Sequence, residues 1–309
     1  MRVFSAEETA AALPYAPMLD ALEAAYRAGL QAPLRHHHSL SKDGEPDATL
    51  LLMPGWAAEI GGVKLVNVTP GNGARGLPAV MASYLVFDAA TGRHEAILDG
   101  AVLTARRTAA VGALGARLLA RQDSRHLLVV GAGRVGEELP DAFRAALPIE
   151  EVTVWNPTAK RGEALVERLR NAGWSAHWQP DLATAVAVAD VLSCATLAVE
   201  PVLQGVWLRP GQHVDLIGSF APHMREADDA CLSRAAVWVD CEGAFVESGD
   251  LAIPMETGAL ARNDVRGTLY DLAVQRPERA AEAITLFKAV GNAVSDLAAA
   301  ATALGKPIS

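Results

Sequence analysis

The sequence feature that most constrains the fold is a glycine-rich turn directly after a short apolar strand. Residues 127–130 read LLVV, and residues 131–136 read GAGRVG before a segment with helical spacing. The first glycine of such a turn permits the tight bend, the second lets the backbone approach a pyrophosphate, and the third lets the helix pack on the strand. The N–H groups and the dipole at the helix start then hold the phosphate charge. We therefore predict that Gly131, Gly133 and Gly136 bind a dinucleotide cofactor.

Around this turn the chain alternates short apolar strands with helical segments. Helices are expected over residues 134–146 and 158–171. Strands are expected over residues 126–130, 151–155, 189–194, 213–217 and 236–240. Strands that alternate with helices form parallel sheets with helices on both faces. The sequence therefore predicts an α/β fold built on a Rossmann-type, doubly wound parallel sheet.

The chain before this region has a different pattern. Apolar residues at helical spacing predict a helix over residues 18–30. Two β-rich runs, residues 62–68 and 79–87, are separated by the turn-forming residues 70–73. This part of the chain is therefore expected to form a helix and a mostly antiparallel sheet, which makes it a second, α+β domain.

Domain boundaries follow from these changes of pattern. A long alanine- and leucine-rich helix is expected from residue 102 to about 121, which marks a boundary near residue 122. Near the end of the chain, a β-rich run at residues 284–287 precedes a return to helical spacing, and this stretch is expected to rejoin the first domain. The prediction is a first domain of residues 1–121 and about 270–309, and a dinucleotide-binding domain of residues 122–269.

Composition excludes several classes of protein. The net charge of -9 and the absence of a basic block oppose binding to a nucleic-acid backbone. No apolar run approaches the roughly 18 to 20 residues that cross a bilayer, and no secretory signal pattern opens the chain, so a cytoplasmic protein is expected. The three cysteines form no Cys-x-x-Cys pair and no zinc-ligand spacing with histidine.

The end of the second predicted strand bears on which dinucleotide binds. NAD-binding folds usually place an acidic residue about 20 residues past the glycines, where it binds the ribose 2′-hydroxyl. Here the strand ends in Asn156, followed by Thr158, Lys160 and Arg161. Because no carboxylate stands there to repel a 2′-phosphate and two cations are near, we predict NADPH, with NADH possible if the cations only face solvent.

Three basic residues of the first domain stand beside strand or turn patterns or near a helix start. Lys64 lies in an otherwise apolar strand, Arg107 in the first turns of the long helix, and Arg35 just after the first helix. By composition alone, cations in such positions are more often surface residues than ligand-binding ones. The run of histidines at residues 36–38 invites a metal site, but consecutive residues of an extended segment point to alternate sides, so no metal is predicted.

Several ordered motifs together resemble the ornithine cyclodeaminase and mu-crystallin family of dinucleotide-binding proteins. The resemblance spans nearly the whole chain, and no single motif is as specific as the set. The motifs lie at residues 62–66, 75–78, 103–110, 131–136, 154–158, 196–201, 247–250 and 286–291.

The resemblance implies a homodimer formed through the first domain and an active site between the domains. It also implies that Lys64, Arg35 and Arg107 hold the carboxylate of a small substrate, which reverses the surface interpretation of these cations. With the glycine turn and the strand that follows it, the predicted cofactor-binding residues are Gly131, Gly133, Arg134, Val135, Gly136, Asn156, Thr158, Arg161, Thr196, Val214 and Ile217.

One departure from the family pattern bears on the reaction. Cyclodeaminases of this family carry a catalytic aspartate at the position that is Phe220 here. A phenyl ring cannot shuttle protons, so the loss of ammonia from ornithine is not favoured. The segment 220–229 instead resembles members that reduce cyclic ketimines, such as Δ1-pyrroline-2-carboxylate to L-proline and Δ1-piperideine-2-carboxylate to L-pipecolate.

Three other functions remain open at the level of sequence. An ornithine cyclodeaminase would need another acid in place of the aspartate. An amino-acid dehydrogenase acting on open-chain substrates would use the same cations. A protein that binds NADPH and a small anion with little turnover, as in mu-crystallin, belongs to a different functional class.

Overall fold

The computed structural model describes residues 1–40 and 44–308, and the chain divides into two compact units. Unit 1 comprises residues 1–107 and 292–309, and unit 2 comprises residues 108–291. The division falls inside helix α3 (Gly100–Leu119), whereas the boundary expected from sequence lies after that helix. In the part of the chain that is described, no helix is long and apolar enough to cross a membrane.

Six strands in the described part of unit 1 form one mixed sheet. Its order is β1-β6-β5-β4-β3-β2, and every neighbouring pair is antiparallel except β1 and β6. The strands are β1 (Arg2–Val3), β2 (His36–Ser39), β3 (Thr49–Trp56), β4 (Ile60–Val68), β5 (Val80–Asp88) and β6 (His94–Asp99). A 3-10 helix, η1 (Pro70–Arg75), occupies the turn predicted between β4 and β5. The mostly antiparallel sheet expected from sequence is therefore confirmed.

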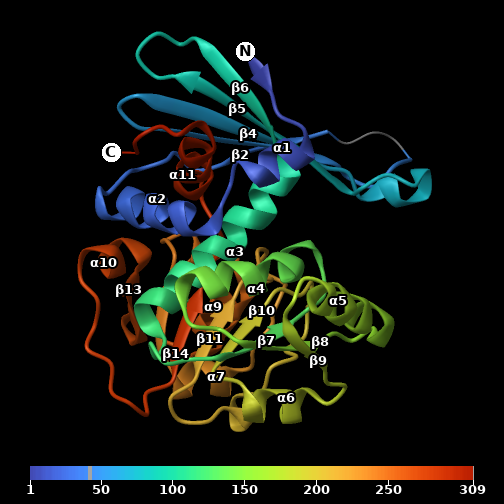
Figure 1. Cartoon of the computed structure of the whole chain (residues 1–309), viewed down its shortest axis with the longest axis vertical. Coiled ribbons are helices and arrows are strands. Elements are labelled where there is room, and N and C mark those ends of the chain that lie inside the picture. Colours follow the sequence, from blue (N-terminus) through green and yellow to red (C-terminus); the bar gives the residue numbers. More distant parts are fainter. Residues whose placement is uncertain (41–43, 309) are drawn as a thin grey trace. The chain divides into compact units, whose positions relative to one another are not determined.

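Two helices from opposite ends of the sequence pack beside this sheet (Figure 1). Helix α2 (Tyr15–Arg27) buries an apolar stripe that includes Leu19, Leu22 and Tyr26, and helix α11 (Ala293–Leu304) packs against α2, β3 and β4. Gly55 of β3 permits this approach, because a Cβ there would lie 3.1 Å from the carbonyl oxygen of Ala293. A short helix, α1 (Ala6–Ala11), begins with a capping box at Ser5 and contacts β6.

Unit 2, all of whose residues are described, is built on an eight-stranded parallel sheet. Its order is β13-β12-β14-β11-β10-β7-β8-β9. The strands are β7 (His126–Val130), β8 (Glu151–Trp155), β9 (Ser175–Trp178), β10 (Val191–Cys194), β11 (His213–Leu216), β12 (Ala236–Val239), β13 (Val265–Thr268) and β14 (Thr285–Lys288). This sheet confirms the predicted Rossmann-type architecture. Because β7 lies between β8 and β10, the strand order reverses there, and such a switch point is where α/β proteins bind ligands.

Strand β14 differs from the sequence expectation. Residues 284–287 were expected to rejoin the first domain, but β14 is inserted between β11 and β12, where all four of its residues are buried. The apolar centre of this run, Leu286 and Phe287, suits a parallel strand that is covered on both faces, and β14 has that environment in unit 2. Only the chain after Gly291 returns to unit 1.

Helices and short connections complete unit 2 (Figure 1). Helix α4 (Arg134–Ala146) has the bounds predicted, and α5 (Ala159–Asn171) begins one residue after its predicted start. The others are α6 (Leu182–Val188), η2 (Gly205–Trp207), α7 (Asp229–Arg234), α8 (Ala244–Glu247), α9 (Gly249–Thr257), η3 (Arg262–Asp264) and α10 (Leu269–Val274). The part of α3 within unit 2 approaches the sheet closely, because Gly112 and Gly115 leave no room for a Cβ beside Asp215 and Phe287.

Candidate active site

The glycine turn of unit 2 has the shape that a pyrophosphate requires. Gly131 has a φ of 109°, and a Cβ there would lie 2.7 Å from the carbonyl oxygen of Ala195. A Cβ at Gly136 would lie 1.9 Å from the carbonyl oxygen of Gly131. Gly133 is the N-cap of α4, so the N–H groups of the first helical turn have no partner within the helix. These residues therefore fit a dinucleotide phosphate, with Arg134 and Val135 in the same turn.

Asn156, at the end of β8, links the glycine turn to the start of α5. Its Oδ1 accepts a hydrogen bond of 2.9 Å from the N–H of Ala132, and its Nδ2 donates one of 2.9 Å to the carbonyl of Thr158. Thr158 is the N-cap of α5, yet its hydroxyl makes no capping bond. Thr158, Lys160 and Arg161 are exposed, so all three can reach a ligand beside this turn.

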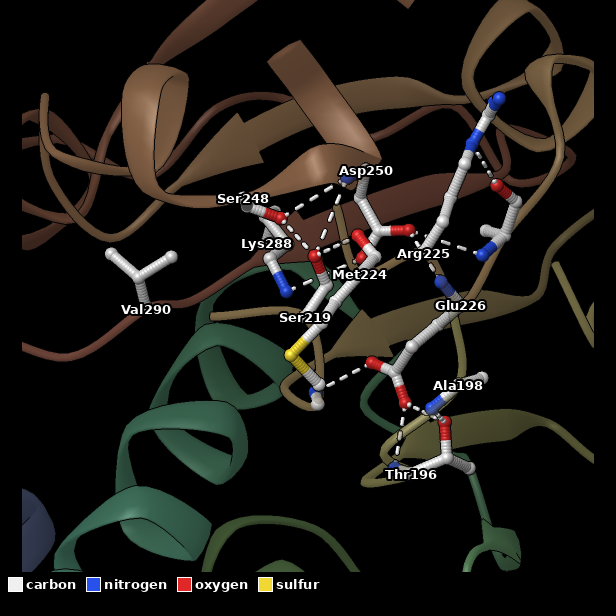
Figure 2. Close-up of polar contacts among 12 residues, drawn as sticks. Thr196, Ala198, Ser219, Met224, Arg225, Glu226, Ser248, Asp250, Lys288 and Val290 are labelled. Carbon is white, nitrogen blue, oxygen red and sulfur yellow. Dashed lines mark hydrogen bonds and ion pairs between the residues drawn. The ribbon is translucent and has the colours of Figure 1, made fainter. Parts of the chain in front are cut away.

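The carboxyl ends of β10 and β11 are joined by one buried carboxylate (Figure 2). Glu226 Oε1 accepts hydrogen bonds from the N–H and the hydroxyl of Thr196 at 2.7 and 2.8 Å, and Oε2 accepts one from the N–H of Gly218 at 2.6 Å. Ile217 lies just past the end of β11. Val214 lies inside the strand with its side chain in the core, so the structure does not favour a direct contact between Val214 and a cofactor.

A second layer of buried polar groups holds the segment that contains Phe220 (Figure 2). Asp250 Oδ1 accepts from the N–H groups of Glu226 and Ala227 at 2.7 and 3.1 Å, and its Oδ2 lies 3.3 Å from Lys288 Nζ. Burial raises the pKa of the Glu226 carboxyl, and Lys288 opposes that increase. The segment therefore has a fixed backbone, whereas the Phe220 side chain itself is 54% exposed.

Neighbouring serines extend this network. The hydroxyl of Ser219 donates to the carbonyl of Met224 at 2.6 Å and shares a hydrogen bond of 2.8 Å with the hydroxyl of Ser248. Ser248 is the N-cap of α9, and its side chain accepts a hydrogen bond from the N–H of Asp250 in the first turn of that helix. Ser248 lies 29 residues along the chain from Ser219, and Asp250 lies 24 residues from Glu226, so no local motif reveals these partners.

Unit 1 contains a separate buried cluster of charges. Lys64 of β4 and Arg107 of α3 both contact Asp296 of α11. Lys64 Nζ lies 2.9 and 2.8 Å from the two carboxylate oxygens, and Arg107 donates from Nε to Oδ1 at 2.8 Å. Lys64 is 2% exposed, Arg107 5% and Asp296 0%. Lys64 therefore points from β4 into the interior of unit 1.

Burial and neighbouring charges set the protonation of this cluster. Burial lowers the pKa of Lys64 to about 8, an effect that Asp296 opposes and that Arg107 and Arg35 reinforce. Burial alone would raise the pKa of Asp296, but Lys64 and Arg107 hold it below its ordinary value. Arg35 is half-buried in the segment before β2, close enough to act on Lys64. The structure thus brings the three predicted cations of unit 1 under one another's influence.

Two further residues of this cluster were not found from the sequence. Asp296 is the acidic residue in the first turn of an otherwise apolar buried helix, and that isolation is the signal that could have identified it. Tyr84 of β5 pairs with Lys64 across the sheet, and its fully buried hydroxyl lies over Gly62. Burial raises the pKa of Tyr84, and Asp296 adds to the increase.

The histidines at residues 36–38 form the edge strand β2. The rings of His36 and His38 project to the same side of the strand, with centroids 6.4 Å apart, and His37 projects to the other. Within residues 1–40 and 44–308, no three histidine, cysteine or acidic side chains are grouped so that they could hold a metal ion.

An apolar strand, a glycine turn and a helix beside the switch point of a parallel sheet form the cofactor-binding part of dinucleotide-dependent oxidoreductases. A buried pair of cations suits a small acid. The chain belongs to the ornithine cyclodeaminase/mu-crystallin family, whose family model matches residues 3–305. The resemblance inferred from the sequence motifs is therefore confirmed.

Individual members of the family are similar to this chain in sequence and in structure. The Δ1-pyrroline-2-carboxylate reductase of Paracoccus denitrificans is 45% identical over 259 residues, which cover 82% of each chain. The structure of Thermococcus litoralis Δ1-pyrroline-2-carboxylate reductase with NADH and L-proline matches with a TM-score of 0.90 and 29% identity, covering 99% of this chain and 97% of that one. An archaeal alanine dehydrogenase dimer with bound NAD matches with a TM-score of 0.88 and 28% identity, covering 99% and 95%.

Proposed function

We propose that this protein is an NAD(P)H-dependent oxidoreductase that reduces cyclic ketimine carboxylates. The substrate is Δ1-pyrroline-2-carboxylate, reduced to L-proline, with Δ1-piperideine-2-carboxylate and L-pipecolate as a second pair. The observation that carries this proposal is the buried cluster of Lys64 and Arg107, whose two positive charges outnumber the one carboxylate of Asp296. The pyrroline-carboxylate reductases among the relatives support the same substrate class.

The residues of unit 1 bind and orient the acid group. Arg107 commits its Nε–H to Asp296, and a guanidinium has four further N–H donors for a substrate carboxylate. Arg35 adds a second guanidinium, so the substrate is held in one orientation. When bound in unit 2, the reduced dinucleotide supplies the hydride. The imine nitrogen carries a proton, taken from solvent before binding or from Lys64, so that hydride addition to carbon yields the neutral secondary amine.

The exposed Phe220 separates this reaction from cyclodeamination. A cyclodeaminase needs a group that moves protons while ammonia leaves, and the phenyl ring has none. The buried carboxylates nearby, Glu226 and Asp250, instead accept hydrogen bonds from backbone N–H groups. A ketimine reductase needs no acid at residue 220, because its substrate arrives with the carbon–nitrogen double bond already formed.

The deciding experiment is an NADPH-oxidation assay with the five- and six-membered cyclic imine carboxylates, repeated with NADH. Turnover of either imine supports the proposal. Ammonia release from ornithine without net cofactor turnover would instead indicate a cyclodeaminase, and preferred turnover of pyruvate with ammonia would indicate an amino-acid dehydrogenase. Cofactor oxidation at background with every imine would indicate a binding protein.

We further propose that NADPH is preferred over NADH. The end of β8 has Asn156 where a carboxylate would repel a 2′-phosphate, and the amide is used to hold the glycine turn. Thr158, Lys160 and Arg161 are exposed at the start of α5, where the helix dipole also favours an anion. The T. litoralis relative was crystallised with NADH and the archaeal dehydrogenase with NAD, so this preference would distinguish the chain from them.

We also propose a homodimer formed through the uncovered face of the unit 1 sheet. Alternation along β3, β4 and β5 sends Lys64 and Tyr84 to the face beneath α11 and sends apolar residues to the opposite face. On that open face Trp56, Leu65 and Met81 are 53%, 39% and 51% exposed. A contiguous apolar sheet face is typical of a protein interface, and the archaeal relative is described as a dimer.

A cytoplasmic location is the last element of the proposal. Cys194 and Cys231 are free, buried thiols, and burial raises the pKa of both. Free thiols are typical of a reducing compartment, where a role in proline metabolism would also place the enzyme. Fractionation of cells that express the tagged protein tests this location.

A further inference from the structure

Asp296, which is not among the predicted site residues, is held in place by contacts at the start of α11. Asn292 caps α11 by accepting a hydrogen bond of 3.1 Å from the N–H of Ser295, and it accepts another of 3.2 Å from the hydroxyl of Tyr26. These contacts fix the helix start, and Asp296 lies in its first turn, where the helix dipole favours a negative charge. The carboxylate then contacts both Lys64 and Arg107.

Lys64 faces an unfavourable set of neighbours apart from this carboxylate. Arg107 approaches it from α3, Arg35 from the segment before β2, and the neutral hydroxyl of Tyr84 from β5. Asp296 from α11 is the negative charge acting on it most strongly. An ammonium that is 2% exposed and flanked by two guanidinium groups loses its proton easily unless a carboxylate offsets them.

We propose that Asp296 is a positioning residue that keeps Lys64 oriented and protonated up to a higher pH, so that the substrate carboxylate meets a charged ammonium near neutral pH. This inference rests on the proposed function, in which Lys64 and Arg107 bind that carboxylate. Asp296 itself touches neither substrate nor cofactor in this scheme. It sets the highest pH at which unit 1 still binds its acid.

The test uses binding rather than turnover, so that it stands even if the proposed reaction fails. Pyrrole-2-carboxylate, a planar analogue that cannot accept hydride, is titrated into the oxidised-cofactor complex at pH 6 and at pH 8.5, and imine turnover is assayed separately. Asp296→Asn removes the charge and keeps the shape. We expect its affinity to fall about tenfold or more at pH 8.5 relative to the parent, and to match or exceed the parent at pH 6, because Lys64 is then charged and less neutralised.

A purely structural role for Asp296 would weaken binding equally at both pH values, and that result overturns the proposal, as does an unchanged affinity at both. Lys64→Arg identifies the titrating group, since arginine stays charged: its affinity should not decline at pH 8.5, and a decline like that of the parent also overturns the proposal. If Asp296→Asn does not fold, the same titration is made with Asp296→Glu, which keeps the negative charge. Its affinity for the analogue should fall over the same pH range as that of the parent, even if binding is weaker at every pH. A fall over a different pH range contradicts the proposal.

Discussion

Arg107 is the residue whose removal most directly tests substrate binding. Arg107→Ala leaves the pair of Lys64 and Asp296 in place but removes the guanidinium. Because charge-assisted hydrogen bonds contribute about 1.5 to 3 kcal/mol, we expect the KM for the imine to rise roughly ten- to a hundredfold. The dissociation constant of the cofactor should change little. Steady-state kinetics and cofactor titration measure the two effects.

The matched control is Arg93→Ala, which removes an exposed arginine of the same unit whose side chain is 75% accessible. It should leave both constants unchanged. Equal KM values for Arg107→Ala and the parent would show that the carboxylate binds elsewhere.

Arg161 tests the choice of dinucleotide. If it pairs with the 2′-phosphate, Arg161→Ala should lower the ratio of kcat/KM for NADPH to that for NADH about tenfold, which corresponds to roughly 1.4 kcal/mol. Arg125→Ala is the control, because Arg125 precedes β7 and therefore lies at the other end of that strand from the glycine turn. A selectivity ratio that stays the same in both variants would argue against a phosphate contact at Arg161.

Single residues of the site differed in how far the sequence revealed them. The tight turn at Gly131 and Gly136 could be predicted because its chemistry demands glycines at fixed spacing after a strand, whereas the cofactor contact of Asn156 stays a prediction from its place after the next strand and from the family motifs. Lys64, Arg35 and Arg107 could be assigned only through the family motifs, since a cation in a short motif looks like any surface cation. Asp296 escaped because its partners are 232 and 189 residues away in the chain, and no local pattern records such a distance.

At the scale of elements, the packing of α3 on the sheet of unit 2 makes a sharp prediction. A Cβ at Gly115 would lie 2.4 Å from the ring of Phe287. Overpacking of this kind costs about 1 to 3 kcal/mol, against a gain of about 1 kcal/mol in helix propensity. We therefore expect Gly115→Ala to lower the free energy of unfolding by up to about 2 kcal/mol in urea titrations.

Gly162 in α5 is the matched control for that substitution. The nearest atom to a Cβ there is 3.5 Å away, which is an ordinary contact. Gly162→Ala should therefore gain up to about 1 kcal/mol from helix propensity. A stabilising Gly115→Ala would mean that α3 can move away from the sheet.

Asp215 in β11 makes the free energy of unfolding of unit 2 depend on pH. Burial raises the pKa of Asp215 to about 7, while the hydroxyl of Ser193 donates to its carboxyl and opposes the increase. An unfolded aspartate titrates near 4, so the protonated folded form contributes stability at low pH that is lost as pH rises through about 7. Asp215→Asn should therefore be more stable than the parent at pH 8, by at most about 4 kcal/mol, with the difference shrinking towards pH 5.

Unfolding in urea at several pH values measures this difference. Asp123→Asn serves as the control, because that side chain is 80% accessible and its neutralisation should not alter the pH dependence. If Asp215→Asn and the parent kept the same separation in stability from pH 5 to pH 8, the buried carboxyl would not be the titrating group.

Helices and strands with a regular pattern of apolar residues were predicted well, and those without such a pattern were not. Strand β7 and helix α4 have the bounds expected, because a continuous apolar run and a capping glycine define them. Strand β9 was missed because half of its residues are exposed and polar at the sheet edge. Strand β14 was recognised as a strand but expected in the other domain, since local sequence does not record which strands become neighbours.

At the scale of the whole molecule, the open sheet face of unit 1 predicts the oligomeric state. Leu65→Arg places a charge in the middle of that face, and we expect it to convert a dimer into a monomer in size-exclusion chromatography with light scattering. Val206→Arg alters an apolar residue of unit 2 that is 71% exposed, and it should leave the mass unchanged. A Leu65→Arg protein that remains dimeric would place the interface on another surface.

The overall architecture could be predicted because the two units have different sequence patterns. Side chains alternate with a period of two residues in the strands of unit 1, whereas strands and helices follow one another in unit 2. The boundary between the two units could not be predicted. Helix α3 belongs to unit 1 up to Arg107 and to unit 2 from Thr108, and its alanine- and leucine-rich composition is the same on both sides. A continuous helix leaves no change of composition by which a boundary can be recognised.

The late position of Asp296 has a consequence for biosynthesis. Lys64 and Arg107 leave the ribosome 232 and 189 residues before their counter-ion, an interval of about ten seconds or more at ordinary rates of translation. Unit 2 is continuous in sequence and can complete its sheet during that time. Unit 1 cannot bury its two cations until Asp296 has been synthesised. Helix α11 therefore completes unit 1 last, when it supplies Asp296. In a chain truncated before α11, unit 1 would stay incompletely folded, and proteases and chaperones would bind it.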